Sequence, residues 1–148
     1  MKKLFRTFIA VAVIGSIATL ASCTKTCDEG YEGDDCKTEI RAKFLGSWKG
    51  NDLCTTGTYS DITVVLTGGS SSVTNVVLSN LGGFGATETV VATLNSAGAL
   101  EISNASISGG RTITGLITSS GSALNFSYTV KAVGQPDDVC AGSNYAKL

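Results

Sequence analysis

Apolar and polar residues alternate along much of the chain beyond residue 44, as they do in β-strands that have one face on a core and one face in water. Every second residue is apolar at 124–130, and the same alternation recurs at 62–66 and 90–94. Clusters of glycine and serine interrupt these segments, and such clusters are typical of tight turns. The pattern predicts about eight strands, near residues 44–51, 57–67, 72–80, 87–94, 99–107, 111–118, 122–132 and 138–147.

The predicted fold is all-β, an antiparallel meander in which each strand pairs with its sequence neighbour because the connections are short. Such a meander has two unpaired edges, and closure into an up-and-down barrel removes them by pairing the first strand with the last. Cys54 follows the first predicted strand and Cys140 opens the last, so a disulfide between them suits a closed barrel. A two-sheet sandwich also accommodates that disulfide, and the barrel is favoured over it. Residues 38–44 predict one or two helical turns before the first strand.

The first 23 residues follow a different pattern, with three basic residues before an apolar run at 8–20 and then the tetrapeptide Leu-Ala-Ser-Cys at 20–23. This pattern is typical of an export signal, since the apolar run is too short to cross about 30 Å of hydrocarbon stably. The tetrapeptide resembles the lipobox of bacterial lipoproteins. The resemblance implies cleavage before Cys23 and attachment of acyl chains to that residue. An ordinary secretory signal, with Cys23 as a further thiol, is the alternative.

Three segments are therefore expected: a signal peptide at 1–22, a lipid-anchored spacer at 23–43 and a β domain at 44–148. Two or three acyl chains hold a protein at a membrane almost irreversibly, whereas one chain holds it weakly. The expected location is the bacterial outer membrane, with the protein anchored through Cys23 and facing either the periplasm or the outside of the cell.

An odd number of cysteines is unusual in an exported chain, and this chain has five. Assigning Cys23 to lipid leaves four, which allow three pairings. The favoured pairing joins Cys27 to Cys36 and Cys54 to Cys140. Loop-closure entropy predicts that these bridges contribute about 2.7 and about 4.6 kcal/mol. A cysteine metal site is the less favoured alternative, because the chain has no histidine and its compartment oxidises thiols.

The spacer holds the pattern cysteine-x-x-glycine-tyrosine-x-glycine-x-x-cysteine from Cys27 to Cys36. This spacing resembles the last loop of an EGF-like module, and the resemblance covers ten residues. It implies a tight disulfide-closed hairpin in which Gly30 and Gly33 have positive φ and Tyr31 packs over the bridge. The acidic residues of this segment lack the order of a calcium-binding loop, so a solvated acidic spacer is the preferred interpretation.

Loss of the three leader cations leaves eight basic and twelve acidic residues, a net charge near −4. A mildly acidic domain lacks the basic surface that binds nucleic acid or an anionic bilayer. Anchoring is therefore expected to depend on the lipid rather than on charge.

The glycine-x-tryptophan motif at 46–48 resembles the opening of a lipocalin. In that family the tryptophan plugs the barrel floor and a basic residue of the last strand crosses it; Lys147, at the far end of the last strand, is the residue available here. The resemblance implies a carrier of a small apolar ligand. The residues that would line its cavity are Phe44, Trp48, Phe126 and Tyr128. Trp48 as an ordinary core residue is the preferred alternative, and both interpretations expect it to be buried.

The absence of histidine removes serine-histidine triads and histidine metal sites. Carboxylates remain as candidate catalytic groups, although periodicity points Glu88 and Glu101 to solvent. The other candidates are Asp52, Asp61, Asp137 and Asp138. No catalytic residue, metal or cofactor is therefore predicted. The predicted function is a non-enzymatic envelope lipoprotein that binds a protein or glycan partner or has a structural role, with the apolar-ligand carrier second and a carboxylate-based hydrolase third.

Overall fold

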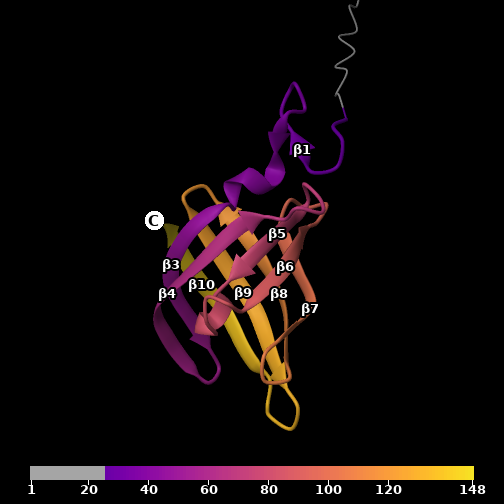
Figure 1. Cartoon of the computed structure of the whole chain (residues 1–148). Helices are drawn as coiled ribbons and strands as arrows, with labels where there is room; N and C mark the ends of the chain where they lie inside the picture. The colour runs from indigo at the N-terminus through magenta and orange to yellow at the C-terminus, as the bar shows by residue number, and fades with distance from the viewer. Residues whose placement is uncertain (1–25) are drawn as a thin grey trace, which may run out of the picture.

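The segments with alternating apolar residues form eight antiparallel strands that close into a barrel (Figure 1). The computed structural model describes residues 26–148, so the predicted leader and Cys23 lie outside the described residues. The barrel strands are β3 (Gly46–Cys54), β4 (Gly57–Gly68), β5 (Asn75–Ser79), β6 (Thr89–Leu94), β7 (Leu100–Ile107), β8 (Arg111–Ser120), β9 (Ala123–Ala132) and β10 (Asp138–Lys147). Each pairs with its sequence neighbour, and β10 closes the barrel against β3. The predicted meander and its closure are thus confirmed, and the sandwich is wrong.

A small N-terminal module precedes the barrel and consists of β1 (Tyr31–Glu32), β2 (Thr38–Glu39) and the 3-10 helix η1 (Ile40–Lys43). The Cys27–Cys36 disulfide closes its hairpin. Gly30 and Gly33 have φ of 89° and 90°, the positive φ angles that were predicted for this hairpin. The predicted helix at 38–44 is correct only in its second half, because Thr38 and Glu39 pair with β1 instead of entering the helix.

The barrel interior is filled by the inward-facing residues of all eight strands. Burial alternates along the strands, as in β9 from Ala123 to Ala132, and its parity changes within β7 and β10, where the register shifts. Trp48, expected to be buried, is 1% exposed. The largest buried side chains are Trp48, Tyr145, Phe44, Phe126, Leu66, Leu78, Leu100, Ile102, Ile113, Ile117, Leu124 and Val64. Cys54 and Cys140 are direct partners across β3 and β10 and form the second disulfide.

The two ends of the barrel differ. The N-terminal module covers the end at which β3 begins, called the closed end here (Figure 1). Because neighbouring strands run in opposite directions, the connections at 55–56, 80–88, 108–110 and 133–137 all lie at the other end, called the open end. No helix within residues 26–148 has the length and apolarity needed to span a bilayer.

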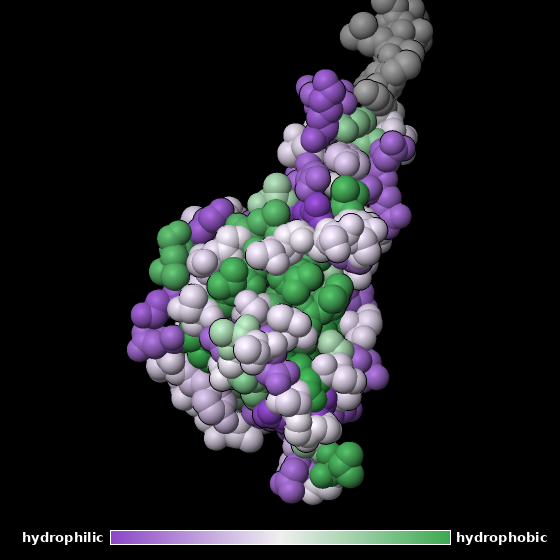
Figure 2. Space-filling model, in the orientation of Figure 1, coloured by the Kyte–Doolittle hydropathy of each residue, from purple (hydrophilic) through white to green (hydrophobic). Residues whose placement is uncertain are grey.

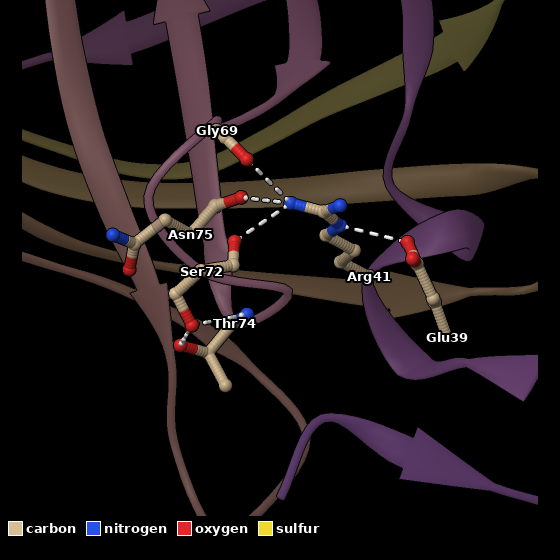
Figure 3. A network of polar contacts seen from close by, with 6 residues as sticks. All are labelled: Glu39, Arg41, Gly69, Ser72, Thr74 and Asn75. Carbon is tan, nitrogen blue, oxygen red and sulfur yellow. Dashed lines mark hydrogen bonds and ion pairs between the residues drawn. The ribbon is translucent and has the colours of Figure 1, made fainter. Parts of the chain in front are cut away.

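Arg41 of η1 fastens the N-terminal module to the barrel (Figure 3). Its Nη1 donates to the carbonyl oxygens of Gly69, Ser72 and Asn75 at 3.0, 2.9 and 2.9 Å. Its Nε donates to the Glu39 carboxylate at 2.8 Å. One guanidinium therefore joins the module to the β4–β5 connection, and its planar set of donors suits several acceptors at once.

Candidate functional site

A groove crosses the open end of the barrel, and it is called the mouth groove here. Its volume is about 330 Å³, and it is lined by Thr56, Tyr59, Phe84, Arg111, Val130, Ala132, Gln135, Pro136 and Asp138. A smaller cavity of about 90 Å³ shares Tyr59, Phe84, Val130 and Asp138 with the groove. Tyr128 and the Cys54–Cys140 disulfide also line this cavity. Three connections that lie far apart in the sequence, at 55–56, 80–88 and 133–137, thus build one concave surface together with strand residues beside them.

Aromatic and cationic side chains form the exposed wall of the mouth groove. Tyr59 is 45% exposed, and its hydroxyl lies 2.8 Å from the Thr56 hydroxyl. The Arg111 guanidinium lies over the half-buried Phe84 ring, 4.5 Å from its centroid, an attractive cation–π geometry. Arg111 donates its Nε to the Ser108 carbonyl, and its two terminal nitrogens make no hydrogen bond within residues 26–148. The wall therefore offers aromatic faces beside an available positive charge.

Asp138 fixes the adjoining turn. Its carboxylate accepts hydrogen bonds from the Thr55 hydroxyl, the Thr56 amide and the Thr56 hydroxyl at 2.9, 3.1 and 2.7 Å. Burial by itself raises the pKa of Asp138, but the hydrogen bonds from Thr56 and Thr55 outweigh it, so the pKa lies below its usual value. These bonds hold the β3–β4 turn against the start of β10, beside the disulfide.

Asp52 is a fully buried carboxylate below the cavity. The Tyr128 hydroxyl donates to its Oδ2 at 2.5 Å, and the Tyr145 hydroxyl donates to its Oδ1 at 2.8 Å. Burial, with the neighbouring Asp52 charge and its hydrogen bonds, raises the pKa of both tyrosines well above the usual range. Both hydroxyls therefore stay protonated and able to donate.

Two glycines make room for these tyrosines. Gly50 pairs with Tyr145 across β3 and β10, and Gly115 pairs with Tyr128 across β8 and β9. A Cβ added at Gly50 would lie 2.7 Å from the Tyr145 ring, and one at Gly115 would lie 2.6 Å from the Tyr128 Cβ. A side chain at either position would collide with the partner tyrosine, so glycine is required beside both tyrosines that reach Asp52.

The four residues expected to line a ligand cavity, Phe44, Trp48, Phe126 and Tyr128, all lie in the packed core. Tyr128 also borders the small cavity. The Trp48 indole donates to the Phe44 carbonyl at 2.8 Å. Lys147 lies over the same indole, with its Nζ 5.4 Å from the ring centroid. The Lys147 ammonium therefore lies within cation–π distance of the Trp48 ring.

The candidate carboxylates are scattered. Glu101 is exposed as expected, but Glu88 is half-buried and accepts a hydrogen bond from the Ser108 amide. Asp61 and Asp137 form exposed ion pairs with lysines. Within residues 26–148, Asp52 is the one fully buried carboxylate. Sequence reasoning missed its burial, although Asp52 has the same parity as the buried Trp48 and would face inward if the first strand were extended by three residues.

Asp138 also lies close to the sulfur atoms of Cys54 and Cys140. Because these sulfurs are joined in a disulfide, they do not supply the thiolates that a metal ion needs. Comparison with known proteins adds no relative: no family model matches the chain, and no curated protein matches it.

Proposed function

We propose that this protein is a lipid-anchored lipoprotein of the bacterial outer membrane, without catalytic activity, whose barrel presents the mouth groove to a partner molecule. The lipobox-like tetrapeptide supports the anchor, since acylation of Cys23 would attach the chain just before its described part. The N-terminal module continues from this point and covers the closed end. An anchor at Cys23 would therefore place the closed end next to the membrane, with the mouth groove facing away from the membrane.

The observation that carries the binding role is the contrast between the filled interior and the concave open end. The barrel core is packed with side chains, whereas the mouth groove has a volume of about 330 Å³ and is lined by the exposed Tyr59 and the half-buried Phe84. Aromatic and arginine side chains are enriched at binding hot spots. β3, with nine residues, runs about 30 Å along its tilted course from one end of the barrel to the other, so the packed barrel acts as a rigid spacer between membrane and partner.

A photo-crosslinking experiment in intact cells tests this role. A crosslinking amino acid at Tyr59, in the groove, is compared with one at Leu116, which is 40% exposed on the outer wall of β8. We expect a discrete adduct from position 59 that Phe84→Ala or Arg111→Ala weakens, and none from position 116. Identical adducts from both positions would contradict a partner site in the groove.

Anchoring is tested separately by Cys23→Ala. We expect this variant to move from the membrane fraction to the soluble fraction, because the acyl chains are the proposed attachment. Retention of the variant in the membrane fraction would contradict lipidation at this residue. Protease shaving of intact cells then distinguishes a protein at the cell surface, which is digested, from one that faces the periplasm.

A small apolar ligand is the second candidate, supported by the Trp48–Lys147 arrangement and its likeness to the floor of a lipocalin. The cavity of about 90 Å³ has room for about three water molecules, far less than the several hundred Å³ typical of ligand pockets. A carrier would therefore have to open its core. Saturable binding of an apolar fluorescent probe that changes Trp48 emission would favour the carrier over the surface partner.

A further inference from the structure

Arg111 offers two unoccupied nitrogen atoms to a ligand in the mouth groove. Its Nε donates to the Ser108 carbonyl at 3.0 Å, and its guanidinium carbon lies 4.5 Å from the centre of the Phe84 ring. These two contacts fix the position of the guanidinium and leave its terminal nitrogens available. A guanidinium binds a carboxylate through two parallel hydrogen bonds. Because Arg111 is already held in place, it would bind a carboxylate at a low cost in side-chain entropy.

The carboxylates beside the groove are engaged with other groups. Asp138 accepts three hydrogen bonds from the β3–β4 turn. Glu88 accepts a hydrogen bond from the Ser108 amide; hydrogen bonds from Ser108 are the largest cause of its lowered pKa, and the Arg111 charge is a smaller cause. In the part of the chain that the structure describes, Arg111 forms no ion pair. A ligand therefore gains most by offering an anionic group to Arg111.

The densest group of acidic residues lies far from the groove. It belongs to the N-terminal module, where Figure 2 shows hydrophilic surface, and the barrel separates it from the open end. Exposed charges further apart than about 8 Å are largely screened at physiological ionic strength. Asp137, which is closer to the groove, pairs with Lys131 at 3.0 Å. The acidic residues of the module, which do not repel an anion at the open end, are Asp28, Glu29, Glu32, Asp34 and Asp35.

The small cavity that adjoins the groove accepts a short apolar side chain. Its volume is about 90 Å³, and its walls include the Phe84 ring, Val130 and the Cys54–Cys140 disulfide. The three carbon atoms of a valine side chain need about as much space as the three water molecules that fit this volume, whereas an aromatic side chain needs more. Phe84 lines the cavity and lies under the Arg111 guanidinium. One ligand would therefore reach both features.

A carboxylate next to a short apolar side chain is found on the last residue of a peptide. A small free acid has the same two groups, but it would fill the cavity and leave the groove of about 330 Å³ empty. The preceding residues of a peptide would lie in this groove, against Thr56, Gln135 and Pro136. An acidic sugar would meet Arg111 but would leave the cavity unfilled. The two cavities together thus favour a peptide.

We propose that the mouth groove binds the carboxyl-terminal segment of a partner protein whose last residue is valine or a similarly short apolar residue. Arg111 holds the terminal carboxylate, the small cavity takes the last side chain, and Tyr59 contacts the preceding residues. Capture of a terminal carboxylate is a recurring mode of peptide recognition. This inference rests on the proposed function, in which the mouth groove faces a partner, and it specifies the chemistry of that partner.

Fluorescence anisotropy with the full-length protein in detergent tests the proposal. The probe is a labelled hexapeptide that ends in threonine and valine with a free carboxylate. The control peptides are the same sequence with a terminal amide and the same sequence ending in tryptophan. Arg111→Ala removes the charge, Arg111→Lys keeps it without the paired donors, and Val130→Phe fills the cavity. Lys131→Ala is the matched control, because it removes a positive charge from a neighbouring strand outside the groove lining.

We expect saturable binding of the valine peptide. The terminal amide and Arg111→Ala should each weaken it by about tenfold or more, because each removes the charge-assisted pair of hydrogen bonds. Arg111→Lys should retain part of the affinity, and Lys131→Ala should bind normally. The tryptophan peptide should bind more weakly than the valine peptide, and Val130→Phe should reduce this preference.

Absence of saturable binding up to about 1 mM peptide, equal binding of the amide, or full binding by Arg111→Ala would overturn the proposal. Competition with 3-methylbutanoate and with a trisaccharide of glucuronic acid tests the other sources of a carboxylate. Tighter binding of either competitor than of the peptide would overturn the proposal in favour of that ligand. A Tyr59 adduct in cells without peptide binding would refute this inference and leave the proposed function standing, whereas absence of the adduct would count against the proposed function itself.

Discussion

Removal of the Tyr145 hydroxyl tests whether the buried Asp52 network stabilises the barrel. Tyr145→Phe keeps the ring, which lies 4.6 Å from the Phe126 ring, and deletes only the donor that is 2.8 Å from the Asp52 carboxylate. Tyr145 is 0% exposed, so water does not easily replace the lost donor. A hydrogen bond to a charged group contributes about 1.5–3 kcal/mol, and we expect the free energy of unfolding to fall by this amount.

Chemical denaturation at neutral pH measures the loss, and a double-mutant cycle assigns it to the pair. Asp52→Asn keeps one acceptor oxygen and adds an amide that can donate to the second tyrosine oxygen. Tyr145→Phe should therefore cost less in the Asp52→Asn background than in the native protein, with a coupling energy of about 1 kcal/mol or more. A Tyr145→Phe variant as stable as the native protein within about 0.5 kcal/mol would refute the idea that the hydroxyls stabilise the carboxylate.

The pH dependence gives an independent measure of the same network. A tyrosine in the unfolded chain ionises near pH 10, whereas Tyr128 and Tyr145 stay protonated in the folded barrel because burial and Asp52 raise their pKa. Above pH 10 the unfolded chain has lost protons that the folded protein retains, so stability is complete below this pH and falls as the pH rises. Each tyrosine adds a slope of up to about 1.4 kcal/mol per pH unit, and Tyr145→Phe should remove about half of it.

Three further outcomes are expected. Replacement of both Cys54 and Cys140 by serine opens a loop with a sequence separation of 86. The free energy of unfolding should fall by up to about 4.6 kcal/mol and the melting temperature by roughly 15 °C. An unchanged melting temperature in calorimetry would contradict a stabilising bridge. Arg41→Ala should weaken docking of the N-terminal module by about 2 kcal/mol and speed proteolysis before residue 44, unlike the exposed control Lys43→Ala; equal cleavage rates would count against the Arg41 network. Lys147→Ala should destabilise the barrel by about 0.5–1 kcal/mol and alter emission of the sole tryptophan, and an unaltered spectrum would show that the ammonium contact has no effect.

Strand positions could be predicted from the sequence because each depends on local alternation and on turn residues beside it. The predicted segment 138–147 matches β10 from Asp138 to Lys147, and 111–118 falls two residues short of β8. The first strand was predicted to end at 51 but continues to Cys54. Pairing with β4 and β10 holds the last residues of β3 in the strand, and the local sequence pattern does not predict this pairing. The longer strand places Asp52 inside the barrel.

The sequence by itself determined the all-β class, the meander and the burial of Trp48, and it favoured the observed cysteine pairs, because these follow from residue periodicity and spacing. Only the tertiary structure decided which polar groups are brought together. Tyr145 and Asp52 are separated by 93 residues and meet because closure of the barrel sets β10 beside β3. The pairing register and the bending of strands depend on the whole sheet, so they cannot be predicted from a short stretch of sequence.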